Sequence, residues 1–297
     1  MSKDWQYREL IDGEWKLRVL PDVWSGELWQ EVLSVIGRQA RDRHPQTVRL
    51  ERRVRDKSQP LFLKVFHPPS GIDAAKEFCR SSKAFRFLRQ SVALAAAGFL
   101  APTTVAAGEE RTRRRLKRAF VLTAAVPGEP APEFLRNRYS DGLSGLGLAE
   151  KRLALESLGR EIRSLHDAGF VHGDLVPTNI VIATEPGGGC RFYLMDNDRT
   201  RRYPLWLARS LWKRNLVQLN RFPLPGITLQ DRMRFFRAYS GRPDWSGAGR
   251  RLLTWLERKT RQRRWECDAV DSPGSFRRLM SFNREPAGNV IGDRERV

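Results

Sequence analysis

A chain of 297 residues, 40% hydrophobic and 30% charged, is long enough for a two-lobed domain and has the composition of a globular rather than a disordered protein. Its 54 Lys and Arg outnumber its 34 Asp and Glu, and the net charge of +20 would attract phosphate-rich partners, although solvated arginine-rich faces would give the same excess. Three scattered cysteines exclude a disulfide framework, and the longest weakly polar stretch, residues 91–102, is too short to span a bilayer.

The first half of the chain predicts a sheet with one helix. Four segments between residues 15 and 66 are interpreted as short strands: WKLRVL, EVLSVIG, TVRLERRV and PLFLKVF. In the last of them Leu61, Leu63 and Val65 alternate with a second set of residues that includes Lys64, which is the period of a strand. We expect a helix over about residues 74–97, followed by two further strands, TTVAAG and AFVLTAAV.

The second half is mainly helical. A proline- and glycine-rich stretch at 126–134 predicts a hinge between two lobes. Aliphatic residues at helical spacing then predict a helix that ends at Gly169, where a left-handed cap is expected. Two short apolar strands, NIVIAT and RFYLMD, flank a glycine-rich turn, and the rest predicts amphipathic helices. We therefore expect an α+β chain with an antiparallel-sheet N-lobe over residues 1–125, a mainly helical C-lobe over 126–271 and a polar tail over 272–297.

The segment from His166 to Arg199 carries the strongest chemical signal. Asp174 and Asn179 are separated by five positions in the pattern H-G-D-x-x-x-x-N, and Asp196 ends the strand that follows. Phosphoryl transfer needs one carboxylate to accept the proton of an attacking hydroxyl, and an amide oxygen with a second carboxylate to hold Mg²⁺. Each residue alone would be an ordinary loop residue, but the joint pattern favours a phosphotransferase.

Lys64 is the upstream candidate. A lone Lys among large apolar strand residues is unusual, because strands disfavour Lys. A kinase-like lysine that contacts the nucleotide phosphates would explain it, and so would a charge on an edge strand that prevents aggregation.

These motifs resemble the lipopolysaccharide core kinase family, the Kdo/heptose kinases, which is a branch of the protein-kinase-like superfamily. The similar segments are LFLKVF, SSKAFRFLRQSVALAAAGFLAP, LHDAGFVHGDLVPTNIVI and LMDNDRTRR. The resemblance implies a bilobal protein-kinase-like fold that uses ATP and Mg²⁺. It also implies that Asp174 is the catalytic base, that Asn179 and Asp196 are the Mg²⁺ ligands, and that Lys64 contacts the nucleotide.

Two features depart from the family's pattern. Phe87 stands where the N-lobe helix of this fold usually offers a glutamate to the strand lysine, and Glu77 is one of only two nearby acids. A G-x-G-x-x-G loop over the phosphates is not recognisable, and only Gly37, followed by Arg38, Arg41 and Arg43, occupies the expected region. These departures keep a weakened, scaffold-like protein in consideration.

The expected substrate is a sugar hydroxyl of the lipopolysaccharide inner core, heptose or Kdo. A small-molecule, aminoglycoside-type kinase is the alternative enzyme, but its cationic acceptor would be repelled by the charge of +20. The expected partners are the core glycolipid and, peripherally, the anionic inner membrane. Nucleic acid is disfavoured because no reading motif is present. The N-terminus has no apolar leader segment, so we expect a cytoplasmic protein, peripheral at most to the inner face of the cytoplasmic membrane.

Overall fold

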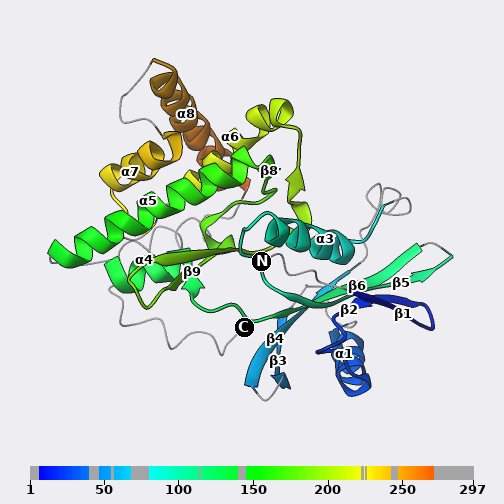
Figure 1. The fold of residues 1–297 in the computed structure, drawn as a ribbon. Helices are drawn as coiled ribbons and strands as arrows, with labels where there is room; N and C mark the ends of the chain where they lie inside the picture. Colours follow the sequence, from blue (N-terminus) through cyan, green and yellow to red (C-terminus); the bar gives the residue numbers. More distant parts are fainter. Residues whose placement is uncertain are drawn as a thin grey trace. The chain divides into compact units, whose positions relative to one another are not determined.

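The computed structural model describes residues 7–39, 47–54, 57–67, 80–113, 115–139, 145–221, 224, 226–241 and 247–270. The chain divides into two compact units, and each is described by itself (Figure 1). Unit 1 comprises Met1–Val126 and Leu194–Thr200, and unit 2 comprises Pro127–Tyr193 and Arg201–Val297. Among the described residues, no helix is long and apolar enough to cross a membrane.

Unit 1 is built on an antiparallel sheet with the strand order β1-β2-β5-β6-β4-β3. The strands are β1 (Arg8–Asp12), β2 (Trp15–Val19), β3 (Thr47–Val54), β4 (Lys57–Phe66), β5 (Thr104–Thr112) and β6 (Arg115–Ala124). The helices α1 (Gly26–Gln39) and α3 (Lys83–Ala96) cover opposite faces of this sheet (Figure 1).

Strand β4 alternates as its sequence predicts. Leu61, Leu63 and Val65 are buried in the core that α1 closes, whereas Phe66 belongs to the core beneath α3. Because successive side chains of a strand point to opposite faces, Lys64 lies on the α3 face with Phe66. Its ammonium lies 5.4 Å from the centre of the Phe66 ring.

The strand expected at EVLSVIG is wrong, because this segment lies inside α1. Its buried residues, Leu28, Val32, Val35 and Ile36 among them, follow helical spacing along one face. A short apolar run rich in β-branched residues cannot be assigned to helix or strand by periodicity alone. Gly37 therefore sits in a helix and not in a turn between strands, while the last two arginines of the suggested phosphate loop lie outside the described residues.

Unit 2 is mainly helical. Its helices are α4 (Ala131–Tyr139), α5 (Gly145–Asp167), α6 (Leu205–Arg221), α7 (Leu229–Ser240) and α8 (Gly247–Val270). Short strands complete it: β7 (Glu129–Pro130), β8 (Phe170–Val171), β9 (Ile180–Thr184), β10 (Cys190–Leu194) and β11 (Arg201–Arg202). Strand β9 lies between β10 and β7, and β8 pairs with β11. The predicted cap at Gly169 is confirmed, since α5 ends at Asp167 and Gly169 has φ +82°.

Candidate active site

The H-G-D segment leaves the core directly after β8. At Gly169 a Cβ atom would approach the Tyr203 carbonyl oxygen to 2.5 Å, so only glycine fits this turn from α5 into β8. The segment continues from His172 to the short helix η1 (Pro177–Asn179), and β9 follows at once. We call residues 172–179 the catalytic loop.

Two amide side chains of α6 hold the catalytic loop. Asn215 accepts a hydrogen bond from the His172 N–H (3.0 Å) and donates one to the His172 carbonyl oxygen. Gln218 accepts from the Leu175 N–H (3.1 Å) and donates to the Gly173 carbonyl oxygen (3.2 Å). Because the two amides also bond each other at 3.0 Å, they form one brace across the loop.

The loop brings Asp174 and Asn179 together. The Asn179 side-chain N–H₂ donates to the Asp174 carbonyl oxygen at 2.9 Å, which leaves the amide oxygen of Asn179 as an acceptor for a ligand. The Asp174 N–H donates to Nδ1 of His172 at 3.2 Å. The backbone of Asp174 is thus fixed on both sides, while its carboxylate is only partly buried.

The two histidines near the loop are packing residues. His172 is fully buried and bonds backbone, as its position before G-D suggests. His166 is also buried, and its two ring nitrogens contact the Tyr239 hydroxyl (2.9 Å) and the Asn215 side-chain oxygen (3.1 Å). Burial lowers the pKa of His166 to about 4, so the ring is neutral at physiological pH.

In unit 1, Lys64 and Asp196 form an ion pair. The Lys64 ammonium lies 2.7 Å from a carboxylate oxygen of Asp196, 132 residues away in sequence, and each side chain is 33% exposed. Asp196 has φ +54°, a left-handed backbone that Asp tolerates better than most residues. This conformation lies at the junction between β10 and the short helix η2 (Asn197–Arg199).

The segment around Asp196 is anchored by Asn197, which is fully buried. Its side-chain amide donates to the Leu194 carbonyl oxygen at 2.8 Å and to the Ser91 hydroxyl of α3 at 3.4 Å. Asp198 is buried beside it, and burial together with the nearby Asp196 carboxylate raises the pKa of Asp198. Helix α3 therefore supports the segment that carries Asp196 through Asn197.

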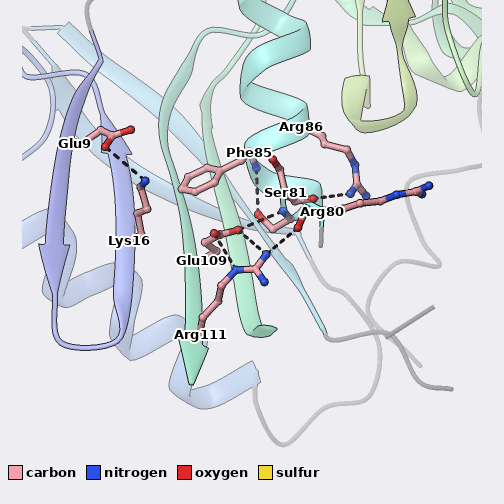
Figure 2. A network of polar contacts seen from close by, with 9 residues as sticks. Glu9, Lys16, Arg80, Ser81, Phe85, Arg86, Glu109 and Arg111 are labelled. Atoms are coloured by element: carbon pink, nitrogen blue, oxygen red, sulfur yellow. Dashed lines mark hydrogen bonds and ion pairs between the residues drawn. The ribbon is translucent and has the colours of Figure 1, made fainter. Parts of the chain in front are cut away.

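The start of α3 is tied to the sheet by a separate network (Figure 2). Glu109 on β5 accepts from the Ser82 N–H (3.2 Å) and from the Arg111 guanidinium (2.9 Å), and Arg111 donates to the Arg80 carbonyl oxygen (3.0 Å). Ser82 is the N-cap of α3. Since the Glu109 side chain is only 11% exposed, its bond to the Ser82 N–H is shielded from water, whereas the bond from Arg111 to Arg80 is exposed.

Helix α3 itself offers no acid to Lys64, because residues 83–96 contain neither Asp nor Glu. Phe87 is buried in the apolar cluster between α3 and the sheet, with Phe66 and Val121. Glu77, the alternative partner, lies outside the described residues. The α3 face thus makes an apolar contact where the fold usually places a carboxylate.

The structure therefore joins the predicted site residues in two pairs. Lys64 and Asp196 are in contact within unit 1, and Asp174 and Asn179 are bonded within unit 2. Sequence reasoning missed the supporting residues Asn215, Gln218, Asn197 and Glu109. The polar residues within the otherwise apolar stretch NLVQL (215–219) were the available signal for the first two, because buried amides need partners.

Each unit offers oxygen donors of the type that Mg²⁺ prefers. No group of three or more His, Cys, Asp or Glu within the described part of the chain could enclose a metal ion. The Asp196 carboxylate of unit 1 and the Asn179 amide oxygen of unit 2 are each of the ligand type that a hard ion such as Mg²⁺ prefers.

Comparisons with known proteins find a matching family and similar solved structures. The model of the family described as "Lipopolysaccharide kinase (Kdo/WaaP) family" matches residues 77–239, more than half of the chain. A search of curated proteins finds no match. The structure solved as "WaaP in complex with acyl carrier protein" is 20% identical, covers 80% of this chain and 95% of its own, and superposes with a TM-score of 0.51.

A second solved structure, the kinase domain of Mycobacterium tuberculosis PknI as a double mutant, is 16% identical over 73% of this chain and 90% of its own, with a TM-score of 0.38. The likeness to the WaaP structure and the antiparallel sheet followed by helices confirm the predicted α+β, protein-kinase-like fold.

Proposed function

Because the chain belongs to the Kdo/WaaP lipopolysaccharide kinase family, we propose that it transfers the γ-phosphate of Mg-ATP to a sugar hydroxyl, of heptose or Kdo, in the lipopolysaccharide inner core. The observation that carries the proposal is the braced catalytic loop. Two amides of α6 fix the backbone on both sides of Asp174 and leave its carboxylate partly exposed. A fixed carboxylate that can reach a hydroxyl is what phosphoryl transfer requires of the protein.

In this proposal Asp174 orients the acceptor hydroxyl and takes its proton. Its backbone N–H and carbonyl bonds, to His172 and Asn179, hold the carboxylate in place before the acceptor arrives. Positioning of this kind reduces the entropy cost of bringing the two reactants together in the transition state.

The nucleotide is held by the other three residues. Asn179 and Asp196 would bind Mg²⁺ through the amide oxygen and a carboxylate oxygen, and Lys64 would neutralise phosphate charge. When bound, Mg²⁺ supplies positive charge against the phosphate oxygens. In the described structure Lys64 contacts Asp196 directly, so the pair keeps the lysine aligned without a glutamate from residues 83–96.

The net charge of +20 supports an acidic acceptor. The lipopolysaccharide inner core contains phosphates and acidic sugars, which a cationic surface concentrates, whereas it would repel a cationic aminoglycoside. Such an acceptor places the protein at the inner face of the cytoplasmic membrane. A scaffold without catalysis is disfavoured because all four candidate residues are present.

The test is phosphate transfer by Asp174→Ala and nucleotide binding by Asp196→Ala. We expect Asp174→Ala to lose transfer while Mg-ATP still raises its melting temperature, and Asp196→Ala to lose this Mg-ATP-dependent rise. Asp167→Ala, which removes an exposed carboxylate at the end of α5, is the matched control and should behave as wild type. Retained transfer in Asp174→Ala would show that the base is misassigned. Unchanged core phosphate in a deletion strain, measured by mass spectrometry, would remove the proposed acceptor.

A carrier protein is a second candidate partner. Helices α4 to α8 of unit 2 surround a largely apolar cavity of about 680 Å³, lined by side chains such as Leu135, Leu158, Leu216 and Phe236. A cavity of this size and character suits an alkyl chain. Since the similar WaaP structure contains acyl carrier protein, we propose that an acylated carrier protein inserts its chain here. Co-purification of acyl carrier protein, lost in Leu158→Trp but kept in the exposed Leu153→Trp variant, would test this.

A further inference from the structure

The first turn of α6 exposes two large apolar side chains side by side. Leu205 is 55% exposed and Trp206 is 77% exposed. Single exposed apolar residues are normal on protein surfaces, and Ile11 and Leu229 are examples here. Leu205 and Trp206 differ from these isolated residues in being consecutive. Exposure of a tryptophan is also unfavourable, because its large apolar surface is in contact with water.

Exposed basic residues flank this pair along the chain, and the exposed Asp167 carboxylate lines the same surface hollow as Arg202 and Leu205. Arg201 and Arg202, immediately before the helix, are both exposed. Trp206 and the exposed Arg214 are eight positions apart on α6, which at 3.6 residues per turn places them roughly 80° from each other around the helix axis. Helix α6 contains four basic residues and no acidic one. We call Arg201, Arg202, Leu205, Trp206 and Arg214 the α6 patch.

The α6 patch lies close to the catalytic loop within unit 2. Strand β11 pairs Arg201 with Val171, the residue that precedes the loop. Asn215, which holds the loop, is on the same helix. It lies about 14 Å from Trp206 along the helix axis, because a helix rises 1.5 Å per residue. A surface bound by the patch would therefore be held near Asp174.

We propose that the α6 patch docks the protein onto an anionic membrane surface, with the arginines on lipid phosphates and Leu205 and Trp206 in the headgroup region. Tryptophan, leucine and arginine together are the composition of interfacial helices. The excess charge of the whole chain favours an extended anionic surface over one small docking partner. Membrane docking would bring a lipid-linked acceptor to the catalytic loop. This consequence rests on the proposed function, whereas the docking itself does not.

The test is sedimentation of the full chain with phosphatidylcholine vesicles, with and without phosphatidylglycerol. We expect partition only onto the anionic vesicles, weakening as salt is added. Arg201→Ala/Arg202→Ala should lower partition about 30-fold at low salt, because each basic residue near an anionic surface strengthens binding about fivefold and two are removed. Leu205→Ala/Trp206→Ala should lower it by about tenfold or more, because the apolar burial is lost.

Matched controls remove the same chemistry elsewhere. Leu229→Ala truncates a leucine that is 75% exposed at the first position of α7, and Arg258→Ala/Arg261→Ala removes two exposed arginines of α8. Partition of these variants should stay within about twofold of wild type, because screening limits the reach of distant charges. An equal loss in controls and patch variants would overturn the proposal and leave only non-specific attraction.

Two other measurements separate the alternatives. If patch variants keep vesicle partition but lose binding to purified acyl carrier protein, the patch docks a protein and the membrane proposal is wrong. Phosphorylation of a lipid-free core oligosaccharide should be the same in patch variants and wild type, since none of the five residues belongs to the catalytic loop. Failure of the wild type in that assay would count against the proposed function while vesicle partition still decides the membrane proposal.

Discussion

The side-chain amide of Asn215 bonds both backbone polar groups of His172, accepting from its N–H and donating to its carbonyl oxygen. The same amide oxygen accepts from Nε2 of His166. Asn215 is 1% exposed, so all these bonds are sheltered from water. The geometry of the catalytic loop is therefore set by a residue of α6 that lies outside the loop.

Replacing Asn215 should impair transfer through the loop. Asn215→Ala leaves the N–H and carbonyl of His172 buried without their partner, and we expect a loss of about 3 kcal/mol in the free energy of unfolding. Loop disorder should lower kcat more than it raises KM for ATP. Chemical denaturation and steady-state kinetics measure the two effects. Gln218→Ala removes the two bonds of the brace that are partly exposed. It should lower kcat and reduce the free energy of unfolding by about 1 kcal/mol.

Asn220→Ala is the control for this prediction. Asn220 is on the same helix but bonds Thr260 and Arg232, away from the loop. It should lose stability and keep kcat. If Asn220→Ala and Asn215→Ala lowered kcat equally, the role of Asn215 would be general stability and not positioning.

Lys64→Met separates function from stability. The Lys64–Asp196 pair is one third exposed on each side, and pairs of this kind contribute about 0–1 kcal/mol. We expect little change in melting temperature, a raised KM for ATP and a large loss of transfer. Lys117→Met breaks a similar pair, 2.8 Å from Glu14, and should leave kinetics unchanged. Equal kinetics in the two variants would remove Lys64 from the nucleotide site.

The local elements of both units could be predicted where the pattern was regular. The alternation around Lys64 and the cap at Gly169 follow from period and backbone rules, and both are confirmed. The helix α1 was missed because Val32, Val35 and Ile36 fit a strand as well as a helix. Packing decides between helix and strand, because these residues are buried along one side of α1 against the sheet.

The supporting residues of the candidate site could not be predicted for a different reason. Asn215, Gln218 and Glu109 act through hydrogen bonds to backbone atoms far away in sequence. Such bonds leave no spacing pattern, because a backbone N–H or carbonyl is the same at every residue. The motif residues, by contrast, are recognisable because metal and phosphate chemistry restricts their type.

Lys151 and Asp231 test how burial changes an ion pair. Their charged atoms are 2.6 Å apart, the side chains are 6% and 8% exposed, and Asp231 also caps α7 through Thr228. Burial alone would raise the pKa of Asp231, but hydrogen bonds from Lys151 and Thr228 outweigh it and hold the pKa below its usual value. Lys151→Met should cost about 2 kcal/mol of unfolding free energy, because a charged hydrogen bond to a buried carboxylate is lost while Arg234, 3.1 Å from the other carboxylate oxygen, still pairs with Asp231.

Arg163→Met is the comparison for Lys151→Met. Arg163 and Asp167 are also 2.6 Å apart, but their side chains are 46% and 59% exposed. This variant should lose less than about 1 kcal/mol in the same denaturation experiment. Similar losses in the two variants would show that burial does not govern the strength of these pairs.

His166 should make stability depend on pH. Burial lowers its pKa to about 4 from about 6.5 in the unfolded chain, so between these values the unfolded state binds a proton that the folded state does not. The stabilising contribution is complete above pH 6.5 and is lost as the pH falls towards 4, by up to about 3 kcal/mol. His166→Gln keeps a side chain that can bond Tyr239 and Asn215 but cannot titrate. Denaturation from pH 7 to 4 should therefore show a shallower decline in His166→Gln than in wild type. Parallel declines would mean that the ring is already protonated in the folded protein, which its burial between Tyr239 and Asn215 argues against.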